Sequence, residues 1–343
     1  MSTETDLTFC HAMLPKVSRT FAACIDLLPS PVDQQVLVAY LLCRIADTIE
    51  DTADLPVHEK ERLLTSFRIA LASPASGCPD LAAAFATPRT DDERLTREAG
   101  AVLRSFARLG PAAVAAIRPW VEEMCLGMAS YASVHAEARP GHLVALESLA
   151  ELDRYCYYVA GTVGHLLSDL FRLHAGLTPE HFAQLKKLST SFGLGLQLTN
   201  IIKDVADDRE RGWSFVPHEL CRGARIAPGQ LTDPAHAVAA SVVMAQLIVK
   251  ARGHLDDALA YCCLLPCRQY RLRLFCLTPL FFAIRTLALA ERDPRLLDPR
   301  HKVKITRGAV HRIILATHVV APSNHLVRAY YHQLAGTRRD CLA

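Results

Sequence analysis

The stretch AYLLCRIADTIED, residues 39–51, joins an apolar helical pattern to a cluster of acids. Its polar side chains are spaced i, i+4, i+7 and i+11 and so share one helical face: Tyr40, Arg44, Asp47 and Asp51. Glu50 flanks this stripe. Negative charge near a helix C-terminus is unfavourable by roughly 0.3–1 kcal/mol per exposed group. A bound cation would explain the cluster, and the helix is predicted from about Pro31 to beyond Asp51.

A second stretch, FGLGLQLTNIIKDVADDRERGW at residues 192–213, repeats this design. Its polar residues are spaced i, i+3, i+7 and i+11: Gln197, Asn200, Asp204 and Asp208. Magnesium prefers hard oxygen ligands and is commonly shared between one or two carboxylates and substrate phosphates. Two such helices facing each other predict metal ions that clamp diphosphate groups. A solvated acidic face is the alternative for either motif taken alone.

The hydrophobic pattern is helical along almost the whole chain, because apolar residues recur three and four apart and no long segment alternates. Helix starts are predicted at SPVD (30–33), with Ser30 as N-cap, and at TDDE (90–93) and LTPE (177–180). The fold class is therefore all-α. We expect one domain over residues 1–343, with its core at about 12–335 and about a dozen helices.

Two further segments leave questions open. The stretch ELDRYCYYVAGTVGHLLSDLF, residues 151–171, holds Gly161 and Gly164 among bulky residues. Glycine inside a helix is unfavourable by about 1 kcal/mol, so we expect another group to approach closely, either a packed helix or a substrate chain. The polar stretch 209–234, which contains Arg209, Arg211 and Trp213, is a candidate for a loop that closes over a site.

Composition excludes several classes of protein. The net charge of +3 and an aromatic content of 7% argue against a nucleic-acid surface. The twelve cysteines show no CxxC pair, so we expect buried free thiols in a reducing environment. The segment LFCLTPLFFAIRTLALA (274–290) includes Arg285 and predicts a core helix. With no signal peptide or transmembrane anchor recognised, a cytoplasmic protein is expected.

Seven motifs in the chain together resemble the squalene/phytoene synthase family of head-to-head prenyl transferases. They are VSRTFA (17–22), AYLLCRIADTIED (39–51), GMA (127–129), YCYYVAGTVG (155–164), LQLTNIIKDVADD (196–208), RGWSFVP (211–217) and VKITRG (303–308). The resemblance runs from residue 17 to about 308. It implies the class I terpenoid (isoprenoid) synthase fold, a helical bundle with a central cavity.

The resemblance also implies roles for individual residues. The metal ligands would be Asp47, Glu50, Asp51, Asp204 and Asp208, binding Mg²⁺ or Mn²⁺. The diphosphate groups would be contacted by Ser18, Arg19, Arg44 and Lys203, with Gln197 and Asn200 lining the cavity near the metals. The reaction centre would be lined by Tyr40 and Tyr158, and Phe275 would shield a later carbocation.

In the squalene-forming branch of this family, two molecules of farnesyl diphosphate condense to presqualene diphosphate. The squalene-forming branch then reduces this intermediate with NADPH, whereas the phytoene-type branch loses a proton and uses no nicotinamide. Tyr158 stands where phytoene-type members often carry Arg, and VKITRG resembles the segment associated with NADPH. Lys304 and Arg307 would face the cofactor phosphates, although Thr306 stands where a basic residue is usual. The squalene-forming reaction is favoured over a phytoene, dehydrosqualene or presqualene diphosphate synthase.

Two non-enzymatic alternatives are a catalytically silent interaction protein of the same fold and a carrier of polyprenyl chains. Neither needs the acids, and both acid clusters are intact. An apolar product must still reach a membrane, so a peripheral membrane contact is expected, and nucleic acid is not an expected partner.

Overall fold

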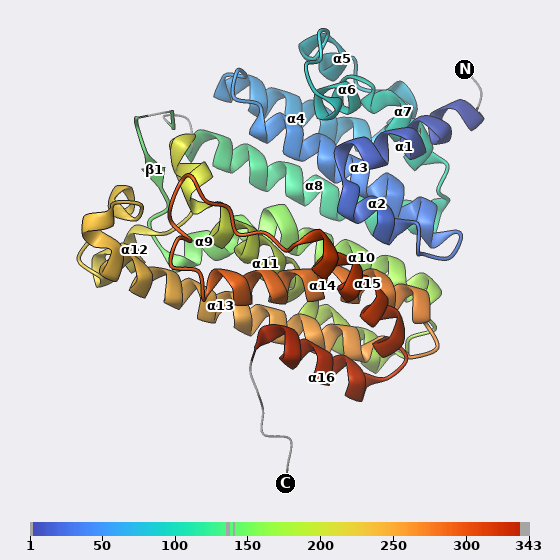
Figure 1. Ribbon diagram of the computed structural model, residues 1–343. Coiled ribbons are helices and arrows are strands. Elements are labelled where there is room, and N and C mark those ends of the chain that lie inside the picture. The colour runs from blue at the N-terminus through green and yellow to red at the C-terminus, as the bar shows by residue number, and fades with distance from the viewer. Residues whose placement is uncertain (1–2, 135–137, 140, 337–343) are drawn as a thin grey trace. The chain divides into compact units, whose positions relative to one another are not determined.

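The computed structural model describes residues 3–134, 138–139 and 141–336 (Figure 1). These residues form sixteen α-helices, and their only strands are β1 (Val144–Ala145) and β2 (Trp213–Ser214), which pair in parallel. The all-α prediction is confirmed. The helices outnumber the expected dozen because several have only six or seven residues, too short for a periodic pattern to reveal.

Contacts divide the chain into two compact units, which are described separately below. The first contains the described residues of 3–134 and 162–178, and the second those of 138–161 and 179–336. The expected single domain and central cavity depend on the relation between these units and stay predictions.

In the first unit, α3 is the central helix and packs against α4, α7 and α8. The helices of this unit are α1 (Thr3–Val17), α2 (Arg19–Ile25), α3 (Val32–Asp51), α4 (Val57–Ala72), 3₁₀ helix η1 (Pro74–Ser76), α5 (Pro79–Ala84), α6 (Asp91–Arg97), α7 (Ala99–Ala107), α8 (Pro111–Val134) and α10 (Thr162–His174). Thr90 caps α6 as predicted, since its hydroxyl accepts the Glu93 N–H at 3.1 Å. The prediction of Ser30 as the N-cap of α3 is wrong, because Pro31 occupies that position and no side chain accepts a capping hydrogen bond there.

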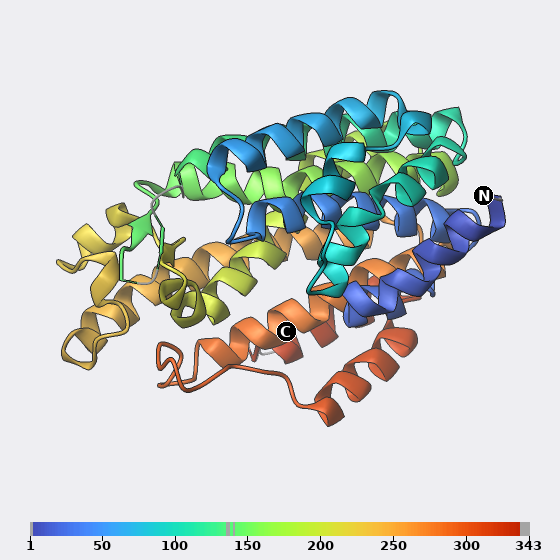
Figure 2. The same cartoon turned by 90° about the horizontal axis from the view of Figure 1, so that it is seen from above.

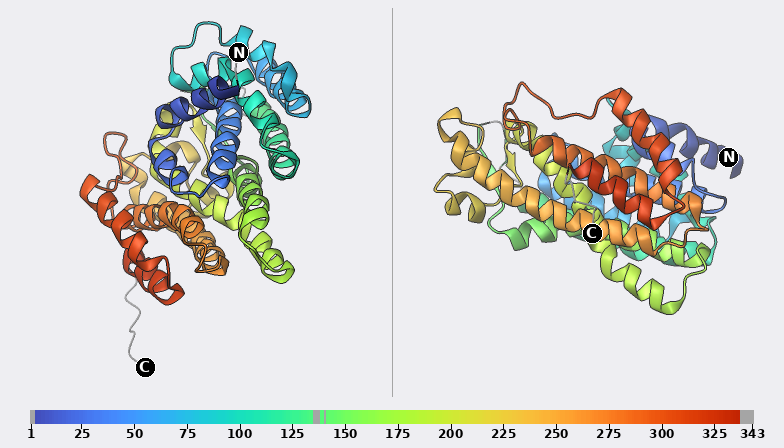
Figure 3. Two further views of the ribbon diagram at one scale, coloured as in Figure 1. Left: turned by 90° about the vertical axis from the view of Figure 1, so that its right-hand side faces the viewer. Right: turned by 60° about the horizontal axis from the view of Figure 1, so that its bottom comes forward.

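In the second unit, α11 is the longest helix and packs against α13 and α14. The elements of this unit besides β1 and β2 are α9 (Leu149–Cys156), π helix η2 (Tyr157–Gly161), α11 (Pro179–Glu210), α12 (His218–Gly223), 3₁₀ helices η3 (Pro228–Gln230) and η4 (Pro234–His236), α13 (Ala237–Leu264), α14 (Tyr270–Ala290), α15 (Arg307–Val320) and α16 (Asn324–Ala335). Figure 2 shows the segment 291–306, which joins α14 to α15 without regular structure. α16 packs against α13 and α14 (Figure 3).

The predicted close approach at Gly161 is confirmed, and the approaching group is a packed helix. A Cβ added to Gly161 would lie 3.3 Å from side-chain atoms of Thr190 and Leu194 on α11. The contact is closer still from the other side, since a Cβ on Gly193 would lie 2.1 Å from the carbonyl oxygen of Ala160. The five-residue π turn Tyr157–Gly161 therefore rests directly on the backbone of α11.

Arg273 is fully buried in α14 and holds three helix ends together. Its Nη1 donates to the carbonyl oxygens of Leu265 at 2.7 Å and Cys262 at 3.1 Å, at the end of α13. Its Nε donates to the carbonyl of Ala321 at 2.6 Å, and its Nη2 to Asn324 Oδ1 at 2.7 Å, at the turn between α15 and α16. The guanidinium thus donates hydrogen bonds to four acceptor oxygens in the protein interior.

We expect Arg273→Met to lower the free energy of unfolding by about 3 kcal/mol or more, because each buried acceptor that loses its donor costs about 1–3 kcal/mol. Urea denaturation followed by circular dichroism measures this. The matched control is Arg271→Met, which replaces an exposed arginine of the same helix and should change stability by less than about 0.5 kcal/mol. Equal stability of the two variants would contradict the structural role of Arg273.

By length and composition, two stretches of the described chain could cross a membrane: Pro234–Leu264, which contains α13, and α14. The most apolar window of α14 is 78% buried, in agreement with the core helix predicted for residues 274–290. The corresponding window of Pro234–Leu264 is 33% buried. Core helices also satisfy this criterion, so it is weak support for insertion.

Candidate functional site

The first acid cluster occupies the C-terminal half of α3, which ends at Asp51. Arg44 lies on the same stripe, and its Nε donates to Asp92 Oδ1 on α6 at 2.8 Å. Its Nη1 lies 3.9 Å from Asp47 Oδ2. Asp92 therefore fixes the guanidinium beside the acids, a partner that reasoning from the sequence did not identify.

The carboxylates of this cluster are unfavourable as charged groups without a cation. Burial, reinforced by Asp51 and Asp47, holds the pKa of Glu50 well above its usual range. Burial and the charge of Asp51 raise the pKa of Asp47 to about 7, against the opposing effect of Arg44. The Lys60 ammonium donates to the backbone carbonyl of Glu50 and not to its carboxylate. In the described structure, the buried Oε1 of Glu50 has no hydrogen-bond partner.

These features fit a divalent cation. A hard cation would give Glu50 Oε1 the partner it lacks and would lower the electrostatic cost of ionising Asp47. Among the described residues, no group of three or more His, Cys, Asp and Glu side chains is assembled around a common metal position. Mg²⁺ is commonly held by one or two carboxylates together with water and substrate phosphate.

An aromatic pair lies on the N-terminal side of this stripe. The rings of Phe21 and Tyr40 have centroids 5.6 Å apart. Ser18 caps α2 by accepting the Phe21 N–H at 3.2 Å, so this residue has a structural role besides its predicted contact with diphosphate. Burial raises the pKa of Tyr40, and the Ser18 hydroxyl opposes this shift. Arg19 begins α2, but its side chain lies outside the described residues.

The second acid cluster lies at the C-terminal end of α11, which continues to Glu210. Its three carboxylates are each paired with a cation: Asp204 with Lys203, Asp208 with Arg211 and Asp207 with Lys302. Burial raises the pKa of Asp208 to about 6, although Arg211 acts in the opposite direction. The remaining predicted members of this stripe, Gln197 and Asn200, are half-buried and exposed. Each acid of the cluster therefore has a cation beside it, and of these cations Lys203 is the predicted diphosphate contact.

Two of these counter-ions were not predicted. Arg211 also lies over the Trp213 ring, 5.6 Å from its centroid. Its position three residues after Asp208 is a spacing that brings side chains together on a helix, so the sequence held a signal for it. Lys302 contacts Asp207 at 2.7 Å from a segment far along the chain, and no local pattern shows such a pair.

The predicted aromatic residues of the second unit lie on elements that pack against α11. Tyr158 belongs to the π turn and makes an edge-on contact with Tyr157, with 5.4 Å between ring centroids. Phe275 is 4% exposed in α14. Tyr158 and Phe275 therefore lie on elements that pack against α11, the helix that carries the second acid cluster.

The segment VKITRG is anchored at its start. Val303 is buried, and the preceding Lys302 is bonded to Asp207 on α11. Lys304 and Arg307 are exposed, and neither forms an ion pair within the described part of the chain. Thr306 caps α15 by accepting the Ala309 N–H at 3.3 Å, which gives this departure from the family pattern a structural reason. Two cations are thus left available to an anionic ligand.

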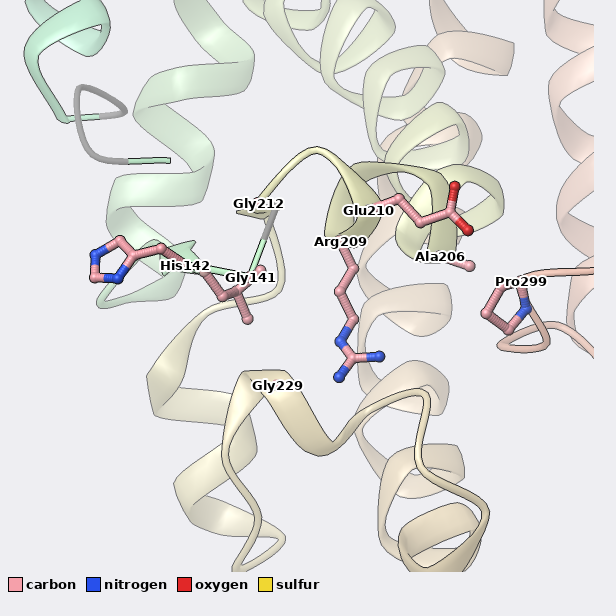
Figure 4. A pocket seen from close by; sticks show the side chains of 9 residues that line it. Gly141, His142, Ala206, Arg209, Glu210, Gly212, Gly229 and Pro299 are labelled. Carbon is pink, nitrogen blue, oxygen red and sulfur yellow. The ribbon is translucent and has the colours of Figure 1, made fainter. Parts of the chain in front are cut away.

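A cavity of about 240 Å³ lies beside the end of α11 (Figure 4). It is lined by Gly141, His142, Leu143, Ala206, Arg209, Glu210, Gly212, Gly229 and Pro299, none of which was a predicted site residue. The polar stretch 209–234 forms part of its wall and is held by the pairing of β2 with β1 and by a bond from Arg209 to Thr232. Closure of this stretch over a substrate stays a prediction.

The structure therefore assembles the predicted residues into two groups. The first unit contains Ser18, Tyr40, Arg44, Asp47, Glu50 and Asp51, and the second contains Tyr158, Gln197, Asn200, Lys203, Asp204, Asp208, Phe275, Lys304 and Arg307. The expected facing of the two acid clusters is a relation between the units and stays a prediction.

The family model for squalene/phytoene synthases matches residues 14–309. A squalene synthase of Schizosaccharomyces pombe is 32% identical over 306 residues, which cover 89% of this chain and 64% of that protein. The human squalene synthase is 30% identical over 321 residues, which cover 93% of this chain and 72% of the human protein. The solved structure of TcSQS with the ligand BPH1237 is 28% identical, covers 99% of this chain and 94% of its own, and superposes with a TM-score of 0.80. The chain belongs to the squalene/phytoene synthase family.

Proposed function

We propose that this chain condenses two molecules of farnesyl diphosphate to presqualene diphosphate and then reduces this intermediate to squalene with NADPH. The observation that carries the proposal is the repeated design of α3 and α11. Each helix ends in carboxylates whose ionisation is opposed by burial, and each carries a cation near its acids. The relatives named squalene synthase support the choice of reaction.

Asp47, Glu50 and Asp51 would hold Mg²⁺ at the first cluster, and Asp204 and Asp208 would hold it at the second. Bound Mg²⁺ would stabilise the negative charge that develops on a departing diphosphate. Arg44 and Lys203 add positive charge at the same ends of the two helices. Because Asp92 fixes the Arg44 guanidinium, its donors are already oriented when substrate arrives.

The allylic cation left by diphosphate release must be kept from water. Aromatic faces stabilise cations by about 0.5–2 kcal/mol, and each unit supplies such rings. In the first unit, these are Tyr40 and its neighbour Phe21, and in the second they are Tyr158 and Phe275. Tyr40 is protonated at neutral pH, like any tyrosine, and burial raises its pKa further, so its hydroxyl could also donate a hydrogen bond to an anion.

The reductive step is supported by Lys304 and Arg307, which would bind the phosphates of NADPH. The alternative is a phytoene, dehydrosqualene or presqualene diphosphate synthase, which needs no NADPH. It is favoured by Thr306, whose hydroxyl caps a helix where the family usually places a basic side chain.

Product analysis separates these reactions. Purified protein is incubated with farnesyl diphosphate and Mg²⁺, with and without NADPH, and the products are identified by mass spectrometry. Squalene with NADPH, and presqualene diphosphate without it, is the expected result. A polyene that forms equally in both reactions supports the alternative branch, and no consumption of substrate supports a silent interaction protein.

The ion pair between Lys302 and Asp207 yields a prediction about NADPH. It joins VKITRG to the end of α11 at 2.7 Å, with Lys302 54% exposed. Exposed ion pairs contribute roughly 0.2–1 kcal/mol. We therefore expect Lys302→Ala to raise the KM for NADPH by about two- to fivefold, while presqualene diphosphate formation without NADPH is unchanged. Steady-state kinetics and fluorescence titration with NADPH measure the two effects.

The matched control is Lys250→Ala. Lys250 also forms an ion pair in the second unit, with Asp153 at 2.8 Å, on a helix remote in sequence from VKITRG. This variant should leave the KM for NADPH unchanged, and Lys302→Arg should restore it. A Lys302→Ala variant with wild-type affinity would show that the ion pair does not position the segment.

A further inference from the structure

The segment from Pro299 to Gly336 differs in charge from the rest of the chain. It contains six Lys and Arg residues and five His residues, and it contains no Asp or Glu. The remainder of the chain has more acids than Lys and Arg together. A positive charge excess is thus concentrated on α15, α16 and the segment that precedes them.

One face of α15 combines this charge with exposed aliphatic side chains. Arg312, Leu315 and Val319 are spaced i, i+3 and i+7, so they lie on one stripe. Leu315 is 68% exposed and Val319 is 71% exposed. The opposite face is buried through Ile313 and Thr317. α15 therefore packs within the unit through its buried face, and its exposed face carries a second apolar stripe that contains Leu315 and Val319.

The cations on this face are not neutralised by the protein. Arg312 is exposed and forms no ion pair within the described part of the chain, and the same holds for Arg328 on α16. α16 packs beside α15 and adds Leu326, which is 44% exposed (Figure 3). On the buried side of α16, the Tyr331 hydroxyl donates to Asp256 at 2.8 Å.

From this surface we infer that α15, with α16 beside it, binds the surface of an anionic lipid bilayer. Helices that lie in a bilayer interface present aliphatic side chains to the acyl region and Lys or Arg to the headgroups. Each cation near an anionic surface strengthens binding roughly fivefold. Here the aliphatic stripe and the unpaired Arg312 share one face, so both contributions act in the same orientation.

Other occupants fit this face less well. If a second copy of the chain bound here through the same face, two segments 299–336 would meet, and each contains Lys and Arg but no Asp or Glu. Like charges across an interface are unfavourable. Single-stranded nucleic acid would require aromatic side chains for stacking, and the stripe of Arg312, Leu315 and Val319 offers none. A bilayer needs neither, and it would receive an apolar product. The inference goes beyond the proposed function, and its test needs no substrate.

The test is co-sedimentation with vesicles. The probes are vesicles of equal parts phosphatidylglycerol and phosphatidylcholine, and vesicles of phosphatidylcholine alone. We expect the intact chain to bind the anionic vesicles and to bind the neutral ones about tenfold less. The double variant Leu315→Ser/Val319→Ser should bind anionic vesicles about tenfold more weakly, and Arg312→Gln should bind them roughly fivefold more weakly.

The matched control is Val238→Ser/Val249→Ser on α13. These valines are 82% and 71% exposed, so the control removes comparable aliphatic surface from a helix that lies outside the cationic segment. It should bind like the unchanged chain. Failure of the unchanged chain to bind anionic vesicles, or an equal loss in the two double variants, would overturn the inference. Because all four side chains are exposed, thermal unfolding should show both variants folded.

Discussion

Asp47→Asn is expected to reduce diphosphate release from farnesyl diphosphate by about a thousandfold and, in the same protein, to raise the stability of the metal-free fold. Activity falls because Asp47 is a proposed metal ligand, and its loss would weaken the metal contribution to leaving-group stabilisation, which amounts to several kcal/mol. Stability rises because burial and Asp51 already hold the pKa of Asp47 at about 7. A neutral amide in this position avoids the cost of charging a half-buried group.

The pH dependence of this gain has a definite sign. The folded-state pKa of Asp47, about 7, lies above its ordinary value of 3.8. Between these values the folded chain binds the proton more tightly than the unfolded chain does. The Asp47 contribution therefore favours folding at low pH and is lost as the pH rises through 7. The stability difference between variant and wild type should thus be larger at pH 8 than at pH 5.5.

Thermal unfolding in excess chelator at both pH values measures this difference, and a diphosphate-release assay measures activity. Asp26→Asn serves as the control, because it replaces an exposed aspartate of the same unit. It should change neither property. An Asp47→Asn variant that keeps full activity, or that is less stable than wild type at pH 8, would contradict the assignment of this cluster.

Gly193→Ala has the second large expected effect. A Cβ at this position would lie 2.1 Å from the carbonyl oxygen of Ala160 and 2.8 Å from the amide nitrogen of Gly161. Both atoms belong to the backbone of the π turn, so they cannot rotate away as a side chain could. We expect a loss of roughly 3 kcal/mol in stability, by overpacking of a core contact, together with a fall in activity because Tyr158 moves with the turn.

The matched control is Gly253→Ala within α13, where an added Cβ meets no atom within 4 Å. Alanine in a helix interior is more favourable than glycine by about 0.5–1 kcal/mol, so this variant should gain stability. Chemical denaturation of both variants tests the contrast. Equal and small effects would show that the π turn does not depend on a bare backbone at Gly193.

The positions of the two acid clusters could be predicted because helical periodicity is a local property. Tyr40, Arg44 and Asp47 share a stripe in the structure because a spacing of three or four residues places side chains on one face of any helix. The same reasoning correctly found the second stripe and the all-α fold. α3 runs from Val32 to Asp51, so the predicted extension beyond Asp51 is wrong, while both α3 and α11 do carry their acids at the C-terminal end.

Contacts between distant segments could not be predicted in this way. Asp92 fixes Arg44 from another helix, and Lys302 reaches Asp207 from a segment without regular structure. The π turn was also missed, because a one-residue expansion leaves the hydrophobic pattern helical and its close contact with Gly193 joins two segments distant in the sequence. The failed Ser30 cap shows the same limit, because Pro31 takes the N-cap position instead.

The central claim is that two acid clusters bind metal-complexed diphosphate in one active enzyme. It is tested most directly by incubating the chain with radiolabelled farnesyl diphosphate, without NADPH, in Mg²⁺ or in excess chelator. The account predicts that Mg²⁺ converts two molecules of substrate into one presqualene diphosphate and one inorganic diphosphate. It also predicts that chelator stops this reaction and that Asp47→Asn and Asp204→Asn each slow it by about a thousandfold. Product formation in chelator, or full turnover by either variant, would contradict the claim.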